Sequence, residues 1–378
     1  MEINVHYQVL AAVFVIAAVL GVIVNKTNFC TMGAVSDWIN MGDYGRMRAW
    51  LLAMAVAMGG VAIMESTGII TLGSETFPPY RSAGFSWLRF IVGGVLFGIG
   101  MTLGSGCGNK TLVRVGAGNL KSLVVLAVAA VMSYLMLWTP FYEQLFHPWV
   151  SATSIDLAQH GIASQELGAV IAGLTGLTGM PPSRTFNAAV GGLIAAALMV
   201  FVLRSAEFRG SSDNLLGGIA VGFAVLAGWY LTGGPLGQAW KEYADFATVV
   251  PSRVQVQSYT FISPMGDTVR YLLSPGDFSL VNFGVVAMAG VIAGSFIYAM
   301  ATSGFRIECF VSMKDFANHA IGGVLMGVGG VLSMGCTVGQ AITGMSTVAL
   351  GAFLTFMAIV AGAAGTMKYQ YWRMMQED

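Results

Sequence analysis

Four cysteines hold the most distinctive chemistry in this chain of 378 residues: Cys30, Cys107, Cys309 and Cys336. Each lies at a glycine-rich or polar break between apolar runs. A thiol is polarizable and donates a weak S–H hydrogen bond. The sequence has no Cys-x-x-Cys pair, so neither a zinc site nor any other metal site is expected. Thiols at breaks are therefore predicted to contact a solute.

Two of these breaks repeat one design. Residues 93–132 and 322–360 both begin with Gly-Gly-Val-Leu, and an ungapped alignment places Cys107 and Cys336 at the same position. Each copy has a glycine-rich helical segment, a cysteine on a break and a second apolar segment. A repeated pair of interrupted apolar segments is a sequence signature of a transporter's binding site.

The elements around the breaks must lie in a membrane. Hydrophobic residues make up 56% of the chain and charged residues 10%, whereas about a quarter of a soluble domain is charged. We predict an all-α polytopic membrane protein with about nine transmembrane helices, re-entrant half-helices and pseudo-symmetric halves, 1–166 and 167–378, in one transporter domain, 1–378. The expected crossings, each close to the roughly 20 residues that a bilayer requires, are 7–24, 49–70, 85–103, 120–139, 186–203, 215–232, 280–301, 321–334 and 347–367.

Three further segments are too short or too broken to cross. Residues 25–38 carry Cys30, residues 305–316 carry Cys309 in a similar arrangement, and residues 167–180 are apolar but short. Irregular backbone is tolerated at membrane depth only where it is buried in protein or lines a cavity. We therefore expect re-entrant segments at these places.

Basic residues indicate the orientation. The N-terminal segment and the 140–166 connection have no lysine or arginine in their polar parts, whereas other short turns are basic. The positive-inside rule then predicts an external N-terminus and an internal C-terminus. The basic residues used are Arg46, Arg48, Lys110, Arg114, Lys121, Arg204, Arg209, Lys368 and Arg373.

The composition argues against several other functions. A phosphate-binding loop requires glycine directly before Lys-Thr, but Asn109 precedes Lys110 here. A nucleophilic cysteine needs an activating base, and of the four histidines only His319 follows a cysteine motif closely. The net charge of zero gives no indication of a nucleic-acid partner. No cofactor is expected.

The remaining interpretation is a path for a soft anion. Exposed backbone N–H groups at helix starts favour anions, and Gly106, Gly108 and Gly335 would let a small solute approach the backbone. The implied solute is small, such as a sulfur oxyanion with a terminal sulfur. The alternative is that these loops only permit tight helix packing. Lys110 could attract the anion or simply follow the positive-inside rule.

Four segments resemble a known family: NFCTMGAVSDW, GMTLGSGCGNKTLVRVGAGNLKSL, ECFVSMKDF and GGVLSMGCTVGQAITG resemble the YeeE/YedE family of bacterial inner-membrane proteins. The resemblance implies thiosulfate uptake through an hourglass-shaped helical protein whose cysteines relay the anion through S–H···S hydrogen bonds. It makes Cys107 the central relay residue, with Cys30 towards one entrance and Cys309 towards the other. Cys336 matches a loop in which the relay cysteine is less uniformly present.

The expected function is thus non-enzymatic uptake of thiosulfate across the bacterial inner membrane. The expected partners are the solute, membrane lipid and a small cytoplasmic sulfur-carrier protein. Two alternatives stay open at this point: transport of another sulfur or selenium compound, and a membrane sulfurtransferase or thiol oxidoreductase.

Overall fold

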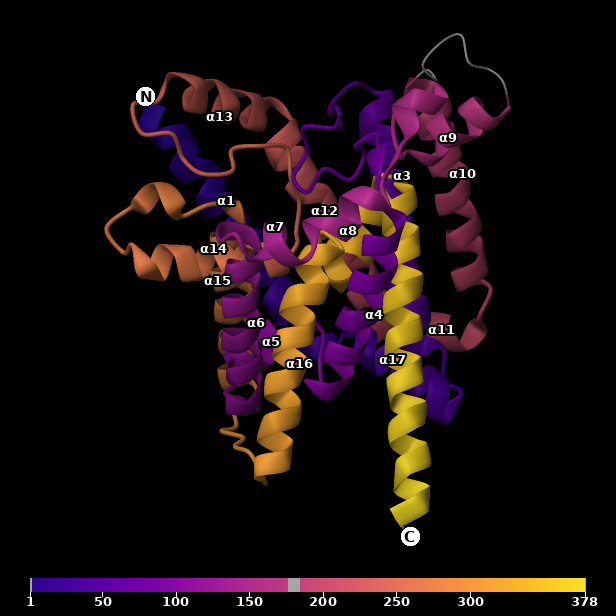
Figure 1. Cartoon of the computed structure of the whole chain (residues 1–378), viewed down its shortest axis with the longest axis vertical. Helices are drawn as coiled ribbons and strands as arrows, with labels where there is room; N and C mark the ends of the chain where they lie inside the picture. Colours follow the sequence, from indigo (N-terminus) through magenta and orange to yellow (C-terminus); the bar gives the residue numbers. More distant parts are fainter. Residues whose placement is uncertain (1, 176–183, 378) are drawn as a thin grey trace.

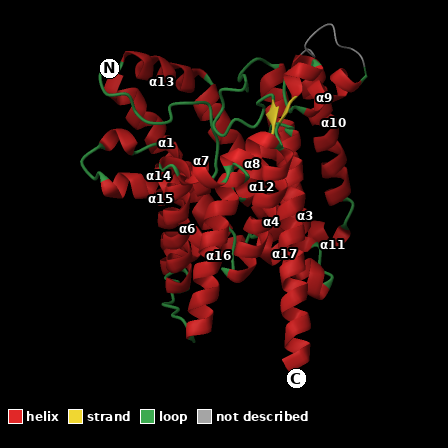
Figure 2. Cartoon of the chain, viewed as in Figure 1, coloured by secondary structure: helices red, strands yellow, loops and turns green. Residues whose placement is uncertain are grey.

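The computed structural model describes residues 2–175 and 184–377, and helices dominate it (Figure 1, Figure 2). Eight stretches of these residues are long and apolar enough to cross a membrane. The prediction of an all-α polytopic membrane protein is therefore confirmed. The long helices in these stretches are α1 (Glu2–Thr27), α3 (Gly45–Ser66), α4 (Trp87–Leu103), α6 (Leu120–Trp138), α10 (Arg184–Leu203), α12 (Ser212–Gly233), α15 (Phe283–Ala301) and α17 (Leu350–Glu377).

A ninth long helix, α16 (Met313–Leu332), packs against α4 and α6. The predicted crossing, 321–334, covers only part of it. The helix begins earlier because Ser312 caps its N-terminus, accepting a hydrogen bond from the Asp315 N–H at 3.1 Å. Lys314 and Asp315 lie in its first turn, so hydropathy alone places the start too late.

Two connections that read as polar loops contain further structure. The 140–166 connection holds three short helices and the strand β2 (Ile155–Asp156), which pairs antiparallel with β1 (Gly84–Phe85). In the 233–275 connection, a fully buried stretch around Tyr259 lies between two helices. The short helices of the chain are α2 (Thr31–Ser36), η1 (Asp37–Met41), α5 (Gly108–Gly116), α7 (Phe141–Leu145), α8 (His147–Ala152), η2 (Leu157–His160), α9 (Leu167–Leu174), α11 (Ala206–Gly210), α13 (Pro235–Phe246), α14 (Ile262–Leu273), η3 (Phe278–Leu280) and η4 (Val338–Gly344).

The long helices pack in matching pairs. Helix α1 packs on α15 as α12 packs on α3, and α4 packs on α17 as α6 packs on α16. Helices α4 and α16, which precede the two repeated breaks, also pack on each other. The N-terminal end of α1 and the C-terminal end of α17 lie at opposite ends of the molecule (Figure 1). The two helices that precede the Cys107 and Cys336 breaks thus lie next to each other.

Glycine permits the closest of these contacts. A Cβ atom placed on Gly98 of α4 would lie 2.3 Å from the Ile359 carbonyl oxygen of α17. On the other side of α4, a Cβ on Gly93 would lie 2.7 Å from the Ser333 backbone nitrogen. Small residues at such positions let membrane helices approach backbone to backbone. The high glycine content therefore serves packing along α4.

Two predicted re-entrant segments need comment. Residues 302–312, around Cys309, form a largely exposed connection without helix, so this segment does not repeat the helical break at Cys30. Its charged side chains, including Arg306 and Glu308, explain the difference because they are stable in water. The apolar segment 167–180 forms α9 up to Leu174, and its end from residue 176 lies outside the described residues.

Candidate functional site

Three cysteines lie at the same kind of helix break. The residue two positions before each one has a left-handed backbone: Asn28 with φ 50°, Ser105 with φ 57° and Met334 with φ 62°. A left-handed conformation costs a non-glycine residue roughly 1–2 kcal/mol, and such strain is concentrated at functional sites. The turn ends one helix and directs the following cysteine, Cys30, Cys107 or Cys336, toward the start of the next.

Side chains from neighbouring helical turns hold these strained loops. Arg114 of α5 donates to the Ser105 carbonyl oxygen at 2.5 Å. In the second copy, the Gln340 amide of η4 donates to the Ser333 carbonyl oxygen. At the first break, Phe29 stacks on Trp50 of α3 with a ring distance of 4.5 Å. Each break is therefore fixed by contacts of its own.

Each cysteine occupies the capping position of the helix that follows. In each case the backbone N–H of the residue three positions after the cysteine points at the cysteine sulfur. These N–H groups belong to Gly33 for Cys30, Lys110 for Cys107 and Gly339 for Cys336, the last with an N···S distance of 3.5 Å. Serine or threonine oxygen usually fills this position. A thiol is a weaker acceptor, so these helix starts retain donor capacity for an anion.

The three breaks meet in the interior. The Cys30 and Cys107 side chains lie within hydrogen-bonding reach of each other. The Cys107 side chain also lies beside that of Thr337, which directly follows Cys336. The exposed fractions are 5% for Cys30 and 0% for Cys107 and Cys336. The structure thus brings three of the four predicted cysteines into one row of buried contacts.

A fourth buried segment completes the row. Thr260 precedes α14 and lies beside the Cys336 thiol. Its neighbours fix it: the Thr343 hydroxyl of η4 donates to the Tyr259 carbonyl oxygen at 2.7 Å, and the Ser258 hydroxyl donates to the Val225 carbonyl oxygen of α12 at 2.7 Å. The Thr260 side chain therefore lies next to Cys336, just as the Cys30 side chain lies next to Cys107.

Buried polar atoms without a partner mark the same row. Among the described residues, the side-chain oxygens of Thr31, Asn109, Thr260 and Thr337 have no well-aligned hydrogen-bond partner. All four residues are at least 96% buried. Nearly all buried polar groups in proteins are hydrogen-bonded, so an unpaired one requires an explanation. The residues beside the cysteines therefore retain unused hydrogen-bonding capacity in the interior.

The charge at one end of the row is positive. The Lys110 ammonium group donates to the Asn28 side-chain oxygen at 2.8 Å and lies close enough to Cys30 and Cys107 to interact with both. Within residues 2–175 and 184–377, no ion pair joins Lys110 to a carboxylate. A buried cation without a protein counter-ion favours an anionic solute.

The predicted glycines lie on the same loops. A Cβ atom on Gly108 would lie 3.5 Å from Cys336 Cβ and 3.7 Å from Met265 Cε, so this glycine faces the second break across the interior. A Cβ on Gly106 would contact Lys110 Cβ at 3.5 Å, and one on Gly335 would lie 3.3 Å from the Gly339 carbonyl carbon. These three positions therefore keep the loops compact around the cysteines.

Cys309 lies apart from this arrangement. It is exposed in the connection between α15 and α16, whereas the other three cysteines are buried. The neighbouring Glu308 carbonyl oxygen accepts the Leu120 N–H at 3.1 Å, which ties this connection to the start of α6. Cys309 is therefore not among the residues that form the buried row, and Thr260 is the residue that lies beside Cys336.

The sequence pattern of proteins described as "Sulphur transport" matches residues 26–365, which include every helix break described above. The chain belongs to the sulphur transport family. Two relatives are called thiosulfate transporter TsuA. The one from Escherichia coli strain K12 is 23% identical over 96% of both chains. The one from Spirochaeta thermophila is 21% identical over 90% of this chain and 93% of its own.

Sequence reasoning missed several polar members of the site in this sulphur transport family protein. Thr31 and Thr337 directly follow Cys30 and Cys336, so a shared Cys-Thr pair was the available signal. Thr260 had no such signal because its segment reads as part of a polar loop. In the described part of the chain, no group of three or more His, Cys, Asp or Glu residues is placed to hold a metal ion.

Proposed function

We propose that this protein takes up thiosulfate across the bacterial inner membrane, and that the anion passes along the row formed by Cys30, Cys107, Thr337, Cys336 and Thr260. The observation that carries the proposal is the meeting of three buried thiols with partnerless polar groups at helix starts. The names of the two relatives support thiosulfate as the solute.

The chemistry of the row suits both ends of this anion. Its terminal sulfur is soft and can accept S–H hydrogen bonds from thiols. Its oxygens can accept hydrogen bonds from the Thr31, Thr260 and Thr337 hydroxyls and from helix-start N–H groups. Lys110 offsets part of the charge. No bond of the solute need break, so the protein acts as a transporter.

The positive-inside rule gives the orientation of the row in the membrane. It assigns the ends of the helices near Arg46, Arg114 and Lys121 to the cytoplasm. The Cys30 and Cys107 breaks then form the inner part of the row, and the Cys336 and Thr260 segments form the outer part. A small cytoplasmic sulfur-carrier protein would receive the anion at the inner end.

Uptake of a dianion needs a source of energy. Moving one elementary charge against 100 mV costs about 2.3 kcal/mol, so a dianion entering a cell with a negative interior costs about 4.6 kcal/mol per 100 mV. Either a cation must accompany thiosulfate or its consumption inside must keep its concentration low.

The test uses cells that lack their own sulfate and thiosulfate uptake and grow on thiosulfate as sulfur source. We expect growth with the parent chain and loss of growth with Cys107→Ser, which replaces a soft thiol by a hard hydroxyl of similar size. Cys309→Ser is the matched control and should grow like the parent, because Cys309 is exposed and apart from the row. Growth with Cys107→Ser at normal expression would refute the path.

One observation favours a second candidate, a sulfurtransferase. The Lys110 ammonium group close to Cys30 would favour a thiolate. A Cys30 thiolate could attack the terminal sulfur of thiosulfate, forming a persulfide as the S–S bond breaks and sulfite leaves with the bonding electrons. Mass spectrometry of the purified protein after exposure to thiosulfate separates the two candidates. A persulfide on Cys30 that is required for turnover would favour the enzyme.

A further inference from the structure

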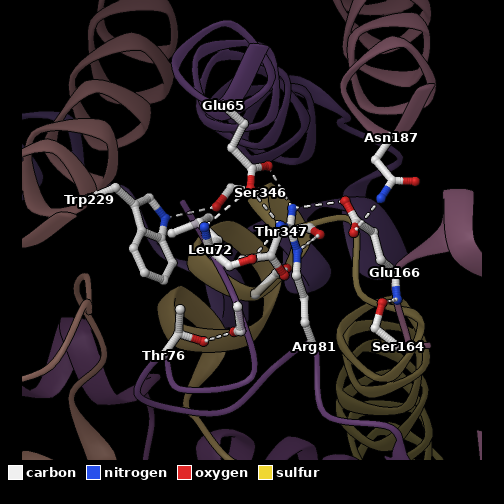
Figure 3. Close-up of polar contacts among 12 residues, drawn as sticks. Glu65, Leu72, Thr76, Arg81, Ser164, Glu166, Asn187, Trp229, Ser346 and Thr347 are labelled. Carbon is white, nitrogen blue, oxygen red and sulfur yellow. Dashed lines mark hydrogen bonds and ion pairs between the residues drawn. The ribbon is translucent and has the colours of Figure 1, made fainter. Parts of the chain in front are cut away.

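A second cluster of polar side chains contains the charged residues Glu65, Arg81 and Glu166 and none of the cysteines (Figure 3). Arg81, in the connection after α3, contacts two carboxylates. Its Nη1 and Nη2 atoms lie 2.6 and 2.8 Å from the two oxygens of Glu65, near the end of α3. Its Nη2 atom lies 3.0 Å from Glu166 Oε1, just before α9. Arg81 and Glu166 are each 6% exposed.

The charges in this cluster do not balance. Glu65 binds both Nη atoms of the Arg81 guanidinium group in a bidentate pair. Glu166 contacts only Nη2, which it shares with Glu65. Among residues 2–175 and 184–377, Glu65 and Arg81 are the charged groups that act on Glu166. Helix α10 presents the neutral Asn187 to Glu166, and the chain after η4 presents the Thr347 carbonyl group to Arg81. The buried Glu166 and the partly buried Glu65 thus share one cation, and a proton on one of them would neutralise the cluster.

Glu166 is the carboxyl group suited to take that proton. It lies outside the membrane-crossing helices, and burial raises its pKa to about 7, with Arg81 opposing the rise and the charge of Glu65 adding to it. Its Oε2 atom accepts a hydrogen bond from the Asn187 side-chain nitrogen at 2.8 Å. The Asn187 side-chain oxygen is buried without a partner. If the amide rotated, that oxygen could accept the proton of a neutral Glu166.

The cluster is attached to the second cysteine break. Arg81 Nε donates to the Thr347 carbonyl oxygen at 3.0 Å, and the Leu167 N–H donates to the Val348 carbonyl oxygen at 3.0 Å. Val348 has a left-handed backbone with φ 57°. The adjacent Tyr80 hydroxyl donates to the Gly339 carbonyl oxygen of η4 at 2.5 Å. The segments that carry Arg81 and Glu166 therefore hold both ends of the chain around η4.

We propose that Glu65, Arg81 and Glu166 form a proton-binding site, in which Glu166 takes up the proton and thereby couples proton binding to the Cys336 segment. A neutral Glu166 weakens its hold on Arg81 and, through Thr347 and Val348, changes the position of η4. Uptake of the dianion is then accompanied by a proton, which offsets one of its two negative charges and so removes about 2.3 kcal/mol per 100 mV from the electrical cost. The coupling of proton binding to uptake rests on the proposed function, whereas the proton-binding site itself does not.

The first test measures radiolabelled thiosulfate uptake into proteoliposomes at fixed internal pH while the external pH is varied between about pH 5.5 and 8.5. A trapped pH-sensitive dye reports proton entry in the same vesicles. For the parent we expect uptake to rise several-fold as the exterior is acidified through about pH 7, together with thiosulfate-dependent proton entry. Glu166→Gln, which fixes a neutral side chain, should remove both responses.

Glu308→Gln is the matched control. Glu308 also pairs its backbone with the start of a long helix, but at the other end of the molecule and with an exposed side chain. It should keep both responses. Parent uptake that ignores the pH gradient, or a full pH response in Glu166→Gln, would overturn the coupling.

A second measurement tests the proton site without transport. Infrared difference spectra of the purified protein between acid and alkaline pH should contain the carbonyl band of a protonated carboxyl group with a midpoint near pH 7, and this band should be missing in Glu166→Gln. If parent proteoliposomes take up no thiosulfate but the band is present, the proposed solute is wrong and the proton site stands. Absence of the band in the parent overturns the proton site whatever the transport result.

Discussion

Replacing Gly108 by alanine gives the sharpest test of where the solute passes. The added Cβ would lie 3.5 Å from Cys336 Cβ, 3.7 Å from Met265 Cε and 3.8 Å from Ile262 Cδ1. These are ordinary van der Waals distances, so the methyl group fits without displacing the backbone. It nevertheless occupies the space between the Cys107 and Cys336 breaks, through which the anion would have to move.

The two expected effects of Gly108→Ala have opposite signs. Gly108 begins α5, where alanine favours the helix by up to about 1 kcal/mol relative to glycine. The folded protein should therefore be unchanged or slightly more stable. For a solute that must squeeze past the new methyl group, an extra methyl group in a packed space costs about 1–3 kcal/mol. Passage should slow by about 5- to 150-fold.

Initial rates of thiosulfate uptake into proteoliposomes and thermal unfolding in detergent measure these two effects. Gly192→Ala in α10 is a neutral control, because nothing lies within 4 Å of the added Cβ. Gly98→Ala is a packing control and should lower the unfolding temperature, because its Cβ would lie 2.3 Å from the Ile359 carbonyl oxygen. Parent-like uptake in a stable Gly108→Ala protein would refute a path between the two breaks.

Three further predictions follow from the site. Lys110→Met should raise the KM for thiosulfate about tenfold or more, because it removes the buried cation beside Cys30 and Cys107; an unchanged KM in proteoliposomes would mean that Lys110 only orients the protein in the membrane. Thr260→Val should lower uptake and leave the unfolding temperature within a few degrees of the parent, since its hydroxyl lacks an aligned partner to lose; a large fall in unfolding temperature would contradict this. The folded-state pKa of Glu166, about 7, lies above its ordinary value of 4.5. Its contribution to the free energy of unfolding, on the order of 3 kcal/mol, is therefore present below about pH 4.5 and is lost as the pH rises through 7. Thermal unfolding from acid to neutral pH should show this loss of stability in the parent and a smaller loss in Glu166→Gln.

The lengths of the apolar runs and the composition were enough to predict the long helices. The predicted crossings fall on long helices because twenty apolar residues have few alternatives in a bilayer, although α16 begins earlier than its predicted crossing, 321–334. The repeat of Gly-Gly-Val-Leu also located two of the central breaks, at Cys107 and Cys336. Both breaks have a left-handed residue two positions before the cysteine, Ser105 and Met334, so the repeated sequence corresponds to a repeated backbone conformation.

The rest depended on contacts between segments distant in sequence. Thr260 belongs to a stretch with mixed polarity, and it joins the row only because α12 and η4 hold its neighbours inside the protein. The segment of Cys309 resembles that of Cys30 only in a cysteine followed by an aspartate and an aromatic residue, at a spacing that differs by one residue. Its charged neighbours keep it at the surface. Arg81 and Glu166 are separated by 85 positions in the chain (166 minus 81), so their pairing had no local signal.

The glycine contacts along α4 have a mechanical consequence. Because Gly93 and Gly98 bring α4 into direct backbone contact with α16 and α17, these helices cannot slide past each other without collision. Large rocking of one part of the molecule against the other would break several such contacts at once. Motion should instead be confined to the short segments that carry Cys30, Cys107, Thr260 and Cys336. Chemical cross-links between α4 and α16 should then leave uptake intact. The long helices would then stay fixed during transport, and only the short segments that line the narrow path would move.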